Sequence, residues 1–246
     1  MIRGLIFDLN GTVIDIRTDE WDSHTYRVTA NFLDYYGIRV LPERLKKMYF
    51  ELNRRQRKNS PEKFPEIDVP GIFRTIIADL TGDGDFPEHL PETAAIVFRA
   101  ASRYKLQAYP DAGRILNSLK DQYLLAALSD GQSAWALPEL RAAGLEKFFS
   151  PILISGNAGF RKPDPRLFES VLDQLNLRPE EAVFVGNDMY RDIYGANKAG
   201  MRTVLFRSGQ GDQNDHGAEP DYIIYHFREL PDAISFLNGP DISPET

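Results

Sequence analysis

The sequence of 246 residues contains no cysteine, which excludes disulfide bonds, cysteine-based metal sites and a cysteine nucleophile together. It also has no apolar run near the roughly 20 residues that a membrane-spanning helix requires. Positive charge is in deficit, because 29 Lys and Arg residues stand against 36 Asp and Glu residues and give a formal net charge of -7. Such a chain is a poor partner for nucleic acid or an anionic membrane.

Signals for export are also missing. The first residues lead directly into a short apolar run and lack the basic and long apolar regions of a signal peptide. We therefore expect a soluble cytoplasmic protein, either a monomer or a homodimer. Hydrophobic residues make up 42% of the chain, enough to bury one large core or a core with an inserted cap.

Short apolar runs bounded by turn residues indicate buried strands. Six such runs lie at residues 4–7, 124–128, 152–154, 182–185, 203–206 and 222–225. Segments with apolar residues at helical spacing lie between several of them. Strands that are apolar on both faces are typical of a parallel sheet covered by helices. The pattern predicts an α/β fold with a Rossmann-like, doubly wound parallel sheet.

Between residues 16 and 104 the strand signals nearly vanish and helical spacing takes over. Four helices are predicted, at about residues 26–36, 45–52, 73–80 and 91–104. A helical block that interrupts an α/β chain after its first strand indicates an inserted cap. We therefore predict a core domain at 1–15 and 105–246 and a helical cap domain at 16–104, with hinge loops near 16–22 and 107–111.

Asp8 is the first candidate for chemistry. It follows the first apolar run and precedes Gly11 and Thr12, so it should project from the carboxyl end of a strand. Ligands bind at that edge of an open α/β sheet. A carboxylate there can attack phosphorus and form an aspartyl-phosphate, which divides one difficult step into two easier ones. On this segment alone, a helix-capping role is the alternative.

Ser129 and Asp130 follow the second predicted strand. A small hydroxyl and nearby backbone N–H groups can bind the oxygens of a phosphoryl group. Because Ser-Asp-Gly is also an ordinary turn, this segment indicates phosphate binding only in combination with the other candidate segments.

Lys162 stands in the segment Lys162-Pro163-Asp164-Pro165, after the third predicted strand. An ammonium group near Asp8 would offset the repulsion between the carboxylate and an incoming phosphate. A helix that begins at one of the two prolines explains those prolines, but it does not explain the lysine.

Two carboxylates, Asp188 and Asp192, follow the fourth predicted strand. Together with Asp8 they supply the hard oxygen ligands that Mg²⁺ prefers. Magnesium would neutralise phosphate charge and hold the phosphorus in line with Asp8. The alternative is a polar loop that caps the next helix.

In this order, the four segments resemble the motifs of haloacid dehalogenase superfamily hydrolases that carry a helical cap after the first motif. The resemblance covers almost the whole chain, including the run from Asp8 to Thr12 and residues 186–196. It implies a Mg²⁺-dependent phosphatase that acts on a small phosphorylated metabolite through an aspartyl-phosphate. The implied roles are nucleophile and metal ligand for Asp8, phosphate binding for Ser129, Asp130 and Lys162, and metal binding for Asp188, Asp192 and the carbonyl of Asn10.

The chain departs from the family pattern at two positions. Asn10 stands where the phosphatases have a second aspartate, which protonates the leaving oxygen and then activates water. An amide cannot carry that proton, and the loss of general acid–base assistance typically costs about 10²- to 10⁴-fold in rate. Asn187 occupies the usual first acidic position of the last motif, so we predict Asp188 as the direct metal ligand and Asp192 either as a ligand through water or as a group that orients the ligands.

Two other functions stay open at this point. The loss of the acid at Asn10 suggests a non-catalytic module that binds phosphate and Mg²⁺. Alternatively, Asp8 attacks carbon in a metal-independent dehalogenase, a function that the Asp188 and Asp192 pair opposes. No residue of the predicted cap identifies a substrate.

Overall fold

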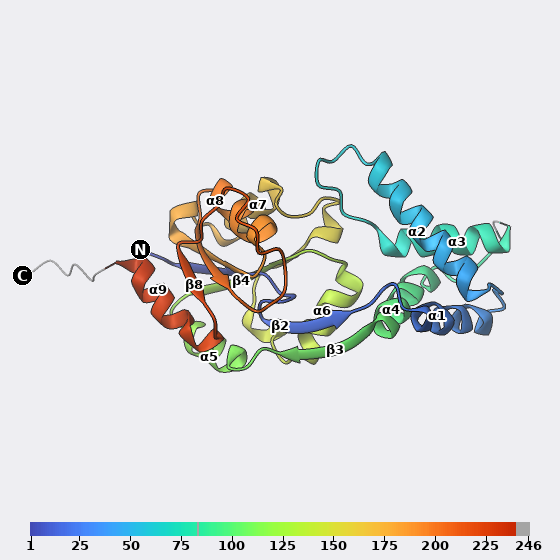
Figure 1. Cartoon of the computed structure of the whole chain (residues 1–246), viewed down its shortest axis with the longest axis horizontal. Helices are drawn as coiled ribbons and strands as arrows, with labels where there is room; N and C mark the ends of the chain where they lie inside the picture. Colours follow the sequence, from blue (N-terminus) through green and yellow to red (C-terminus); the bar gives the residue numbers. More distant parts are fainter. Residues whose placement is uncertain (83, 240–246) are drawn as a thin grey trace, which may run out of the picture.

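The computed structural model describes residues 1–82 and 84–239. It shows a sheet between layers of helices and, to one side, four further helices (Figure 1). The six strands are parallel and hydrogen-bonded in the order β5–β4–β1–β6–β7–β8. They are β1 (Gly4–Phe7), β4 (Leu124–Ser129), β5 (Ile152–Ile154), β6 (Ala182–Gly186), β7 (Arg202–Phe206) and β8 (Tyr222–Ile224). The predicted α/β fold class is confirmed.

Strand β1 shows why its sequence is apolar throughout. Successive side chains of a strand point to opposite faces of the sheet. Leu5 and Phe7 pack with α5 (Ala112–Leu119) and α9 (Leu230–Asn238), whereas Ile6 packs with α7 (Pro165–Leu175) on the other face. Because helices cover both faces, no position of β1 tolerates a polar residue. The remaining core helices are α6 (Ser133–Ala142) and α8 (Gly195–Lys198), and short 3₁₀ turns lie at Glu146–Phe148, Ser155–Asn157, Pro179–Glu181 and Phe227–Glu229.

The four helices at the other end of the molecule form what we call the helical block. They are α1 (Ser23–Tyr35), α2 (Pro42–Asn59), α3 (Val69–Thr81) and α4 (Leu90–Ser102). Aromatic side chains meet at its centre, where the Phe98 ring lies 5.7 Å from Tyr26, 4.5 Å from Tyr49 and 5.6 Å from Phe73. All four predicted helices are present. The last one ends at Ser102, since the following residues enter a strand.

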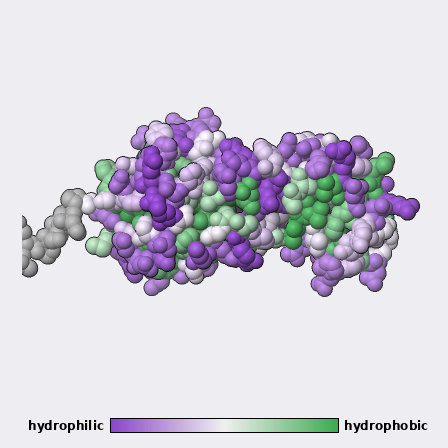
Figure 2. Space-filling view, turned by 90° about the horizontal axis from the view of Figure 1, so that it is seen from below, coloured by the Kyte–Doolittle hydropathy of each residue, from purple (hydrophilic) through white to green (hydrophobic). Residues whose placement is uncertain are grey.

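An antiparallel ribbon of β2 (Ile14–Thr18) and β3 (Arg103–Ala108) connects the helical block to the sheet (Figure 1). The predicted hinge loops near 16–22 and 107–111 are therefore wrong in part, because residues 16–18 and 107–108 are paired in strands. The space-filling view shows a narrower waist between the two parts of the molecule (Figure 2). The ribbon makes the connection a paired structure instead of two separate loops.

The loop between α2 and α3 makes a second connection to the sheet. The Glu66 backbone N–H donates to the Gly159 carbonyl at 3.0 Å, and the Arg161 N–H donates to the Phe64 carbonyl at 2.9 Å. These bonds attach the helical block to the backbone next to Lys162. We refer to this contact as the docked loop.

Among the helices of residues 1–82 and 84–239, none is both long and apolar enough to cross a membrane. The predicted core segment 105–246 ends in residues 240–246, which lie outside the described part of the chain. The predicted domain boundaries stay predictions.

Candidate active site

Asp8 lies directly after β1, at the carboxyl edge of the sheet, and its side chain is buried. Its Oδ1 accepts a hydrogen bond from Lys162 Nζ at 2.7 Å, and its Oδ2 accepts one from Thr12 Oγ1 at 3.0 Å. The turn that follows requires Gly11, whose φ is 89° and whose added Cβ would lie 2.5 Å from the Asn187 amide nitrogen. The sequence thus fixes the carboxylate between two donors.

Lys162 is fully engaged inside the protein. Its Nζ donates to Asp8 Oδ1 and to Asp192 Oδ1, each at 2.7 Å, and to the Leu128 carbonyl at 3.2 Å. Burial alone would lower the pKa of Lys162, but the carboxylates of Asp192 and Asp8 raise it above the usual lysine range. The ammonium group is therefore charged, and the predicted pair of Asp8 and Lys162 is in direct contact.

Asp192 holds the loop that follows β6. Its Oδ2 accepts hydrogen bonds from the backbone N–H groups of Asn187 and Asp188, both at 3.0 Å. Burial raises the pKa of Asp192, the Lys162 ammonium opposes that shift, and the negative charge of Asp8 adds to it. With both oxygens in use, Asp192 positions Lys162 and the loop.

Asp188 is occupied in a different way. Its Oδ1 accepts from the backbone N–H groups of Tyr190 and Arg191 at 3.1 and 2.7 Å, so it caps the π-helical turn Met189–Tyr194. Its Oδ2 accepts from the Arg191 guanidinium at 2.8 and 3.0 Å and from the Asp212 N–H at 2.9 Å. Although burial acts to raise it, these contacts hold the pKa of Asp188 below its usual range. Both oxygens of Asp188 thus accept hydrogen bonds, Oδ1 in capping the turn and Oδ2 from Arg191 and Asp212, and the predicted direct metal contact stays a prediction.

Asn187 faces the site instead. Its side chain lines the cavity described below, whereas that of Asp188 does not. The Asn187 Oδ1 lies 3.1 Å from Thr12 Oγ1, whose single proton it shares with Asp8 Oδ2. Its amide packs closely against backbone, since an added Cβ at Gly211 would lie 2.9 Å from Nδ2. The residue that the sequence marks as a departure is thus the one that presents an oxygen beside Asp8.

Ser129 is the last residue of β4, and Asp130 follows it. Ser129 is buried, its hydroxyl lies 3.4 Å from the Asp130 carbonyl, and it is not among the residues that line the cavity. The predicted phosphate contact of this hydroxyl stays a prediction. Asp130 does line the cavity: its Oδ1 accepts from the Lys162 N–H at 3.0 Å, and its Oδ2 lies 3.7 Å from Arg191 Nη1. Burial raises the pKa of Asp130.

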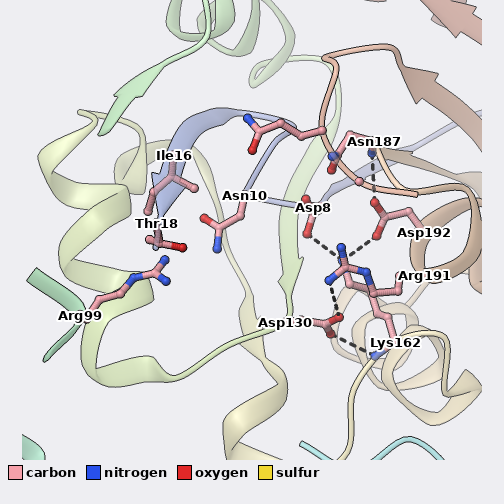
Figure 3. Close-up of a pocket in the computed structure, with 12 residues that line it drawn as sticks. Asp8, Asn10, Ile16, Thr18, Arg99, Asp130, Lys162, Asn187, Arg191 and Asp192 are labelled. Atoms are coloured by element: carbon pink, nitrogen blue, oxygen red, sulfur yellow. Dashed lines mark hydrogen bonds and ion pairs between the residues drawn. The ribbon is translucent and has the colours of Figure 1, made fainter. Parts of the chain in front are cut away.

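These side chains surround a cavity of about 220 Å³ at the edge of the sheet (Figure 3). The predicted site residues on its wall are Asp8, Asn10, Asp130, Lys162 and Asp192. Further lining residues were not predicted, and they include Ile16, Thr18, Arg99, Arg191 and Gln210. Of these, Arg99 carries a sequence signal that could have revealed it, since it is the one basic residue of the apolar helix α4.

The oxygen atoms on the cavity wall decide which metal they could hold. Within the described residues, no three His, Asp or Glu side chains are arranged to hold a metal ion. Asp8, Asp130 and Asp192 contribute carboxylates to the wall, and Asn10 and Asn187 contribute amide groups. Such oxygen donors fit Mg²⁺, which keeps several waters and needs only one or two carboxylates. The donor set fits magnesium in type.

A buried aspartate at the edge of a parallel sheet is thus paired with a buried lysine beside a small cavity. A family model described as haloacid dehalogenase-like hydrolase matches residues 2–200. The chain belongs to this family of hydrolases.

Similar proteins include several phosphatases. A glyceraldehyde 3-phosphate phosphatase of Methanopyrus kandleri is 30% identical over 243 residues, which cover 96% of this chain and 99% of that protein. A protein of the same name from Pyrococcus furiosus is 34% identical over 55% of this chain, and a phosphoserine phosphatase of Thermus thermophilus is 39% identical over 65%. The matched regions span only 58% and 62% of those two relatives.

Among solved structures, a 2-haloacid dehalogenase from Pseudomonas syringae superposes with a TM-score of 0.69 at 22% identity. The superposition covers 96% of this chain and 99% of that one. At this identity the likeness shows the fold alone, and the chemistry has to be argued from the site.

Proposed function

We propose that this protein is a phosphatase that hydrolyses phosphate monoesters of small metabolites through a covalent intermediate on Asp8. The observation that carries the proposal is the contact between Asp8 and Lys162 on the wall of a small cavity. The Methanopyrus relative, matched along its whole length, is named a phosphatase. The two shorter matches carry phosphatase names as well.

The proposed reaction has two steps. A carboxylate oxygen of Asp8 attacks the phosphorus, and the bond between phosphorus and the ester oxygen breaks. Lys162 offsets the repulsion between the carboxylate and the phosphate. Water then attacks the phosphorus of the aspartyl-phosphate, which releases inorganic phosphate and restores Asp8.

The site lacks an acidic side chain at Asn10 that could transfer a proton to the leaving group. The leaving alkoxide needs one proton, and the Asn10 amide on the cavity wall cannot supply it. The proton therefore comes from water or from the substrate itself. We infer slow turnover in consequence, by about 10²- to 10⁴-fold relative to a site with a positioned acid.

The proposal includes Mg²⁺ as cofactor, held by Asp8, the Asn10 carbonyl and the Asn187 amide oxygen. When bound, the ion supplies positive charge that neutralises the phosphate. Asp192 acts beside it by positioning Lys162, and Asp188 by shaping the loop, which revises the roles predicted from the sequence. The hydrogen bonds of both carboxylates support this division.

We further propose that residues 16–104 act as a cap over the core formed by 1–15 and 105–246. The ribbon and the cavity support this assignment, because Ile16 and Thr18 of β2 and Arg99 of α4 reach the cavity wall. A closed cap excludes water until the covalent intermediate has formed.

Phosphate release tests the proposal. The native chain, Asn10→Asp and Asp8→Ala are assayed with Mg²⁺ on an aryl phosphate and on a panel of short phosphate esters. We expect Asp8→Ala to be inactive and Asn10→Asp to be faster than the native chain by about 10²- to 10⁴-fold. If neither the native chain nor Asn10→Asp releases phosphate from any ester, the phosphatase proposal fails.

A second function is favoured by one observation. Two asparagines, Asn10 and Asn187, lie on the cavity wall where an aspartate would supply a proton and a metal-binding carboxylate. A halide leaves carbon without needing a proton. A dehalogenase in which Asp8 attacks carbon therefore needs neither the acid at position 10 nor the carboxylate at position 187. Metal-independent halide release from a short 2-haloacid would favour it. Stabilisation by phosphate and Mg²⁺ without turnover of any ester or haloacid would instead indicate the non-catalytic module.

A further inference from the structure

Arg99 is the described cavity residue that comes from the four helices of the helical block. It lies near the end of α4 (Leu90–Ser102). Buried apolar residues of that helix, such as Ala95 and Phe98, pack inside the helical block. The long side chain of Arg99 reaches out of that block to the cavity. In Figure 3 its guanidinium group lies beside Thr18, across the cavity from Lys162. The cavity thus has cations at both ends.

The guanidinium of Arg99 is held in a fixed orientation. Its Nε and Nη2 donate to the two carboxylate oxygens of Glu139 in α6, at 2.8 and 3.0 Å. The Trp135 ring lies against the guanidinium at 5.4 Å. In the described part of the chain, Nη1 has no acceptor among the side-chain hydrogen bonds of Arg99. One edge of the planar group, formed by Nη1 and the second proton of Nη2, is left for a ligand.

Two arginines and two acidic residues lie together at this end of the cavity. Arg103 Nη1 lies 3.8 Å from the same Glu139 oxygen that Arg99 binds, so two arginines share one buried carboxylate. Glu20 is the other acid near Arg99, and burial raises its pKa, with Arg99 opposing the shift. Neither Glu139 nor Glu20 lines the cavity. A ligand at this end therefore meets the guanidinium of Arg99, with neither of the two carboxylates on the cavity wall.

We propose that Arg99 determines the substrate class by binding a carboxylate at the end of the substrate opposite to its phosphate. The inference rests on the proposed phosphatase function, because it takes the other end of the cavity as the phosphate site. A carboxylate matches the free edge of a guanidinium with two parallel hydrogen bonds. The cavity of about 220 Å³ admits only a short molecule, since pockets for larger ligands measure about 300–1,000 Å³. The substrates are short phosphorylated carboxylic acids.

Three esters that differ in one terminal group test the proposal. Glycerate 3-phosphate ends in a carboxylate, glyceraldehyde 3-phosphate in an aldehyde and glycerol 3-phosphate in a hydroxymethyl group. Their dissociation constants are measured by calorimetry with Mg²⁺ on Asp8→Asn, a variant without the nucleophile. We expect glycerate 3-phosphate to bind about 10- to 100-fold more tightly than glycerol 3-phosphate, the range of a charge-assisted pair of hydrogen bonds.

Substitution of the arginine should remove that preference. Adding Arg99→Gln to Asp8→Asn is expected to weaken glycerate 3-phosphate by about 10- to 100-fold and to leave glycerol 3-phosphate nearly unchanged. Arg103→Gln is the matched control, because it removes the other arginine on Glu139 and does not line the cavity. A double substitution, Arg99→Met with Glu139→Met, avoids leaving a buried carboxylate without its partner if Arg99→Gln fails to fold.

The outcomes separate this inference from the proposed function. Equal binding of the three esters, or an equal loss for all of them in Arg99→Gln, overturns the role of Arg99. So does a loss of preference in Arg103→Gln as large as that in Arg99→Gln. If the preference for glycerate 3-phosphate depends on Arg99 but the native chain and Asn10→Asp release no phosphate, the phosphatase proposal fails and the carboxylate site stands. Turnover of all three esters at equal kcat/KM leaves a phosphatase and refutes the carboxylate site.

Discussion

Replacement of Lys162 by Met is expected to destabilise the protein strongly. The substitution keeps most of the apolar stem but removes the ammonium that binds Asp8 and Asp192 at 2.7 Å each. Both carboxylates are buried, with 8% and 1% of their side chains exposed. Breaking a buried ion pair by removing one partner costs about 3–5 kcal/mol. For a chain of this size that corresponds to a fall in melting temperature of roughly 6–20 °C.

The loss of stability in Lys162→Met should depend on pH. Without the ammonium, the pKa of Asp192, which burial already raises and Lys162 lowers, rises further above its unfolded value. A raised folded pKa means that the folded state binds more protons, so stability is retained at low pH and lost as the pH rises through the folded pKa. The difference in free energy of unfolding between the native chain and Lys162→Met should therefore be larger at pH 8 than at pH 5.

Urea denaturation at both pH values measures these differences. Lys47→Met is the matched control, because Lys47 is exposed and lies 4.0 Å from Glu51 on the surface. We expect it to change stability by no more than about 0.5 kcal/mol. A loss below about 1 kcal/mol for Lys162→Met, within the range of exposed pairs, or a loss that does not change with pH, would refute the view that Lys162 balances two buried carboxylates.

Three further changes test other parts of the site. Gly11→Ala should cost about 1–3 kcal/mol and most of the activity, because the φ of 89° is strained for alanine and its Cβ would displace the Asn187 amide; urea unfolding and turnover measure the two effects. Asn187→Asp should tighten Mg²⁺ binding by about tenfold or more, since ligand charge sets the affinity of such sites, as a calorimetric titration can show. Glu20→Gln should gain stability relative to the native chain as the pH rises above 4.5, because burial raises the pKa of Glu20 and the hydrogen bond from Tyr49 can be kept; thermal unfolding from pH 4 to 7 checks this.

The sheet could be predicted from the sequence because a strand that is covered on both faces is apolar throughout. A strand such as β1 is covered on both faces, so every residue from Gly4 to Phe7 is apolar or small and the run is visible without any partner. Strand β3 is different. Its residues Arg103–Ala108 alternate between half-buried and exposed positions and carry two cations and a glutamine. Their pairing with β2 depends on a segment about 90 positions away, which a local pattern does not contain.

The site could be predicted only as far as its residues follow strands. Asp8 lies directly after β1, Lys162 lies in the loop between β5 and α7, and the two side chains meet at 2.7 Å. In the loop after β6, the direction of each side chain depends on hydrogen bonds that the sequence does not display. Asp188 caps the following turn and Asn187 lines the cavity, a division that residue type alone does not predict. Arg99 was missed because its partner, Glu139, lies 40 residues further along the chain.

The docked loop has a consequence for the proposed cap. If residues 16–104 move away from the sheet, the bonds from Glu66 to Gly159 and from Arg161 to Phe64 have to break. Arg161 is joined directly to Lys162, which binds Asp8, so the proposed movement would also shift the lysine. Admission of the substrate and placement of Lys162 beside Asp8 would then be coupled, and substitutions between α2 and α3 would alter both.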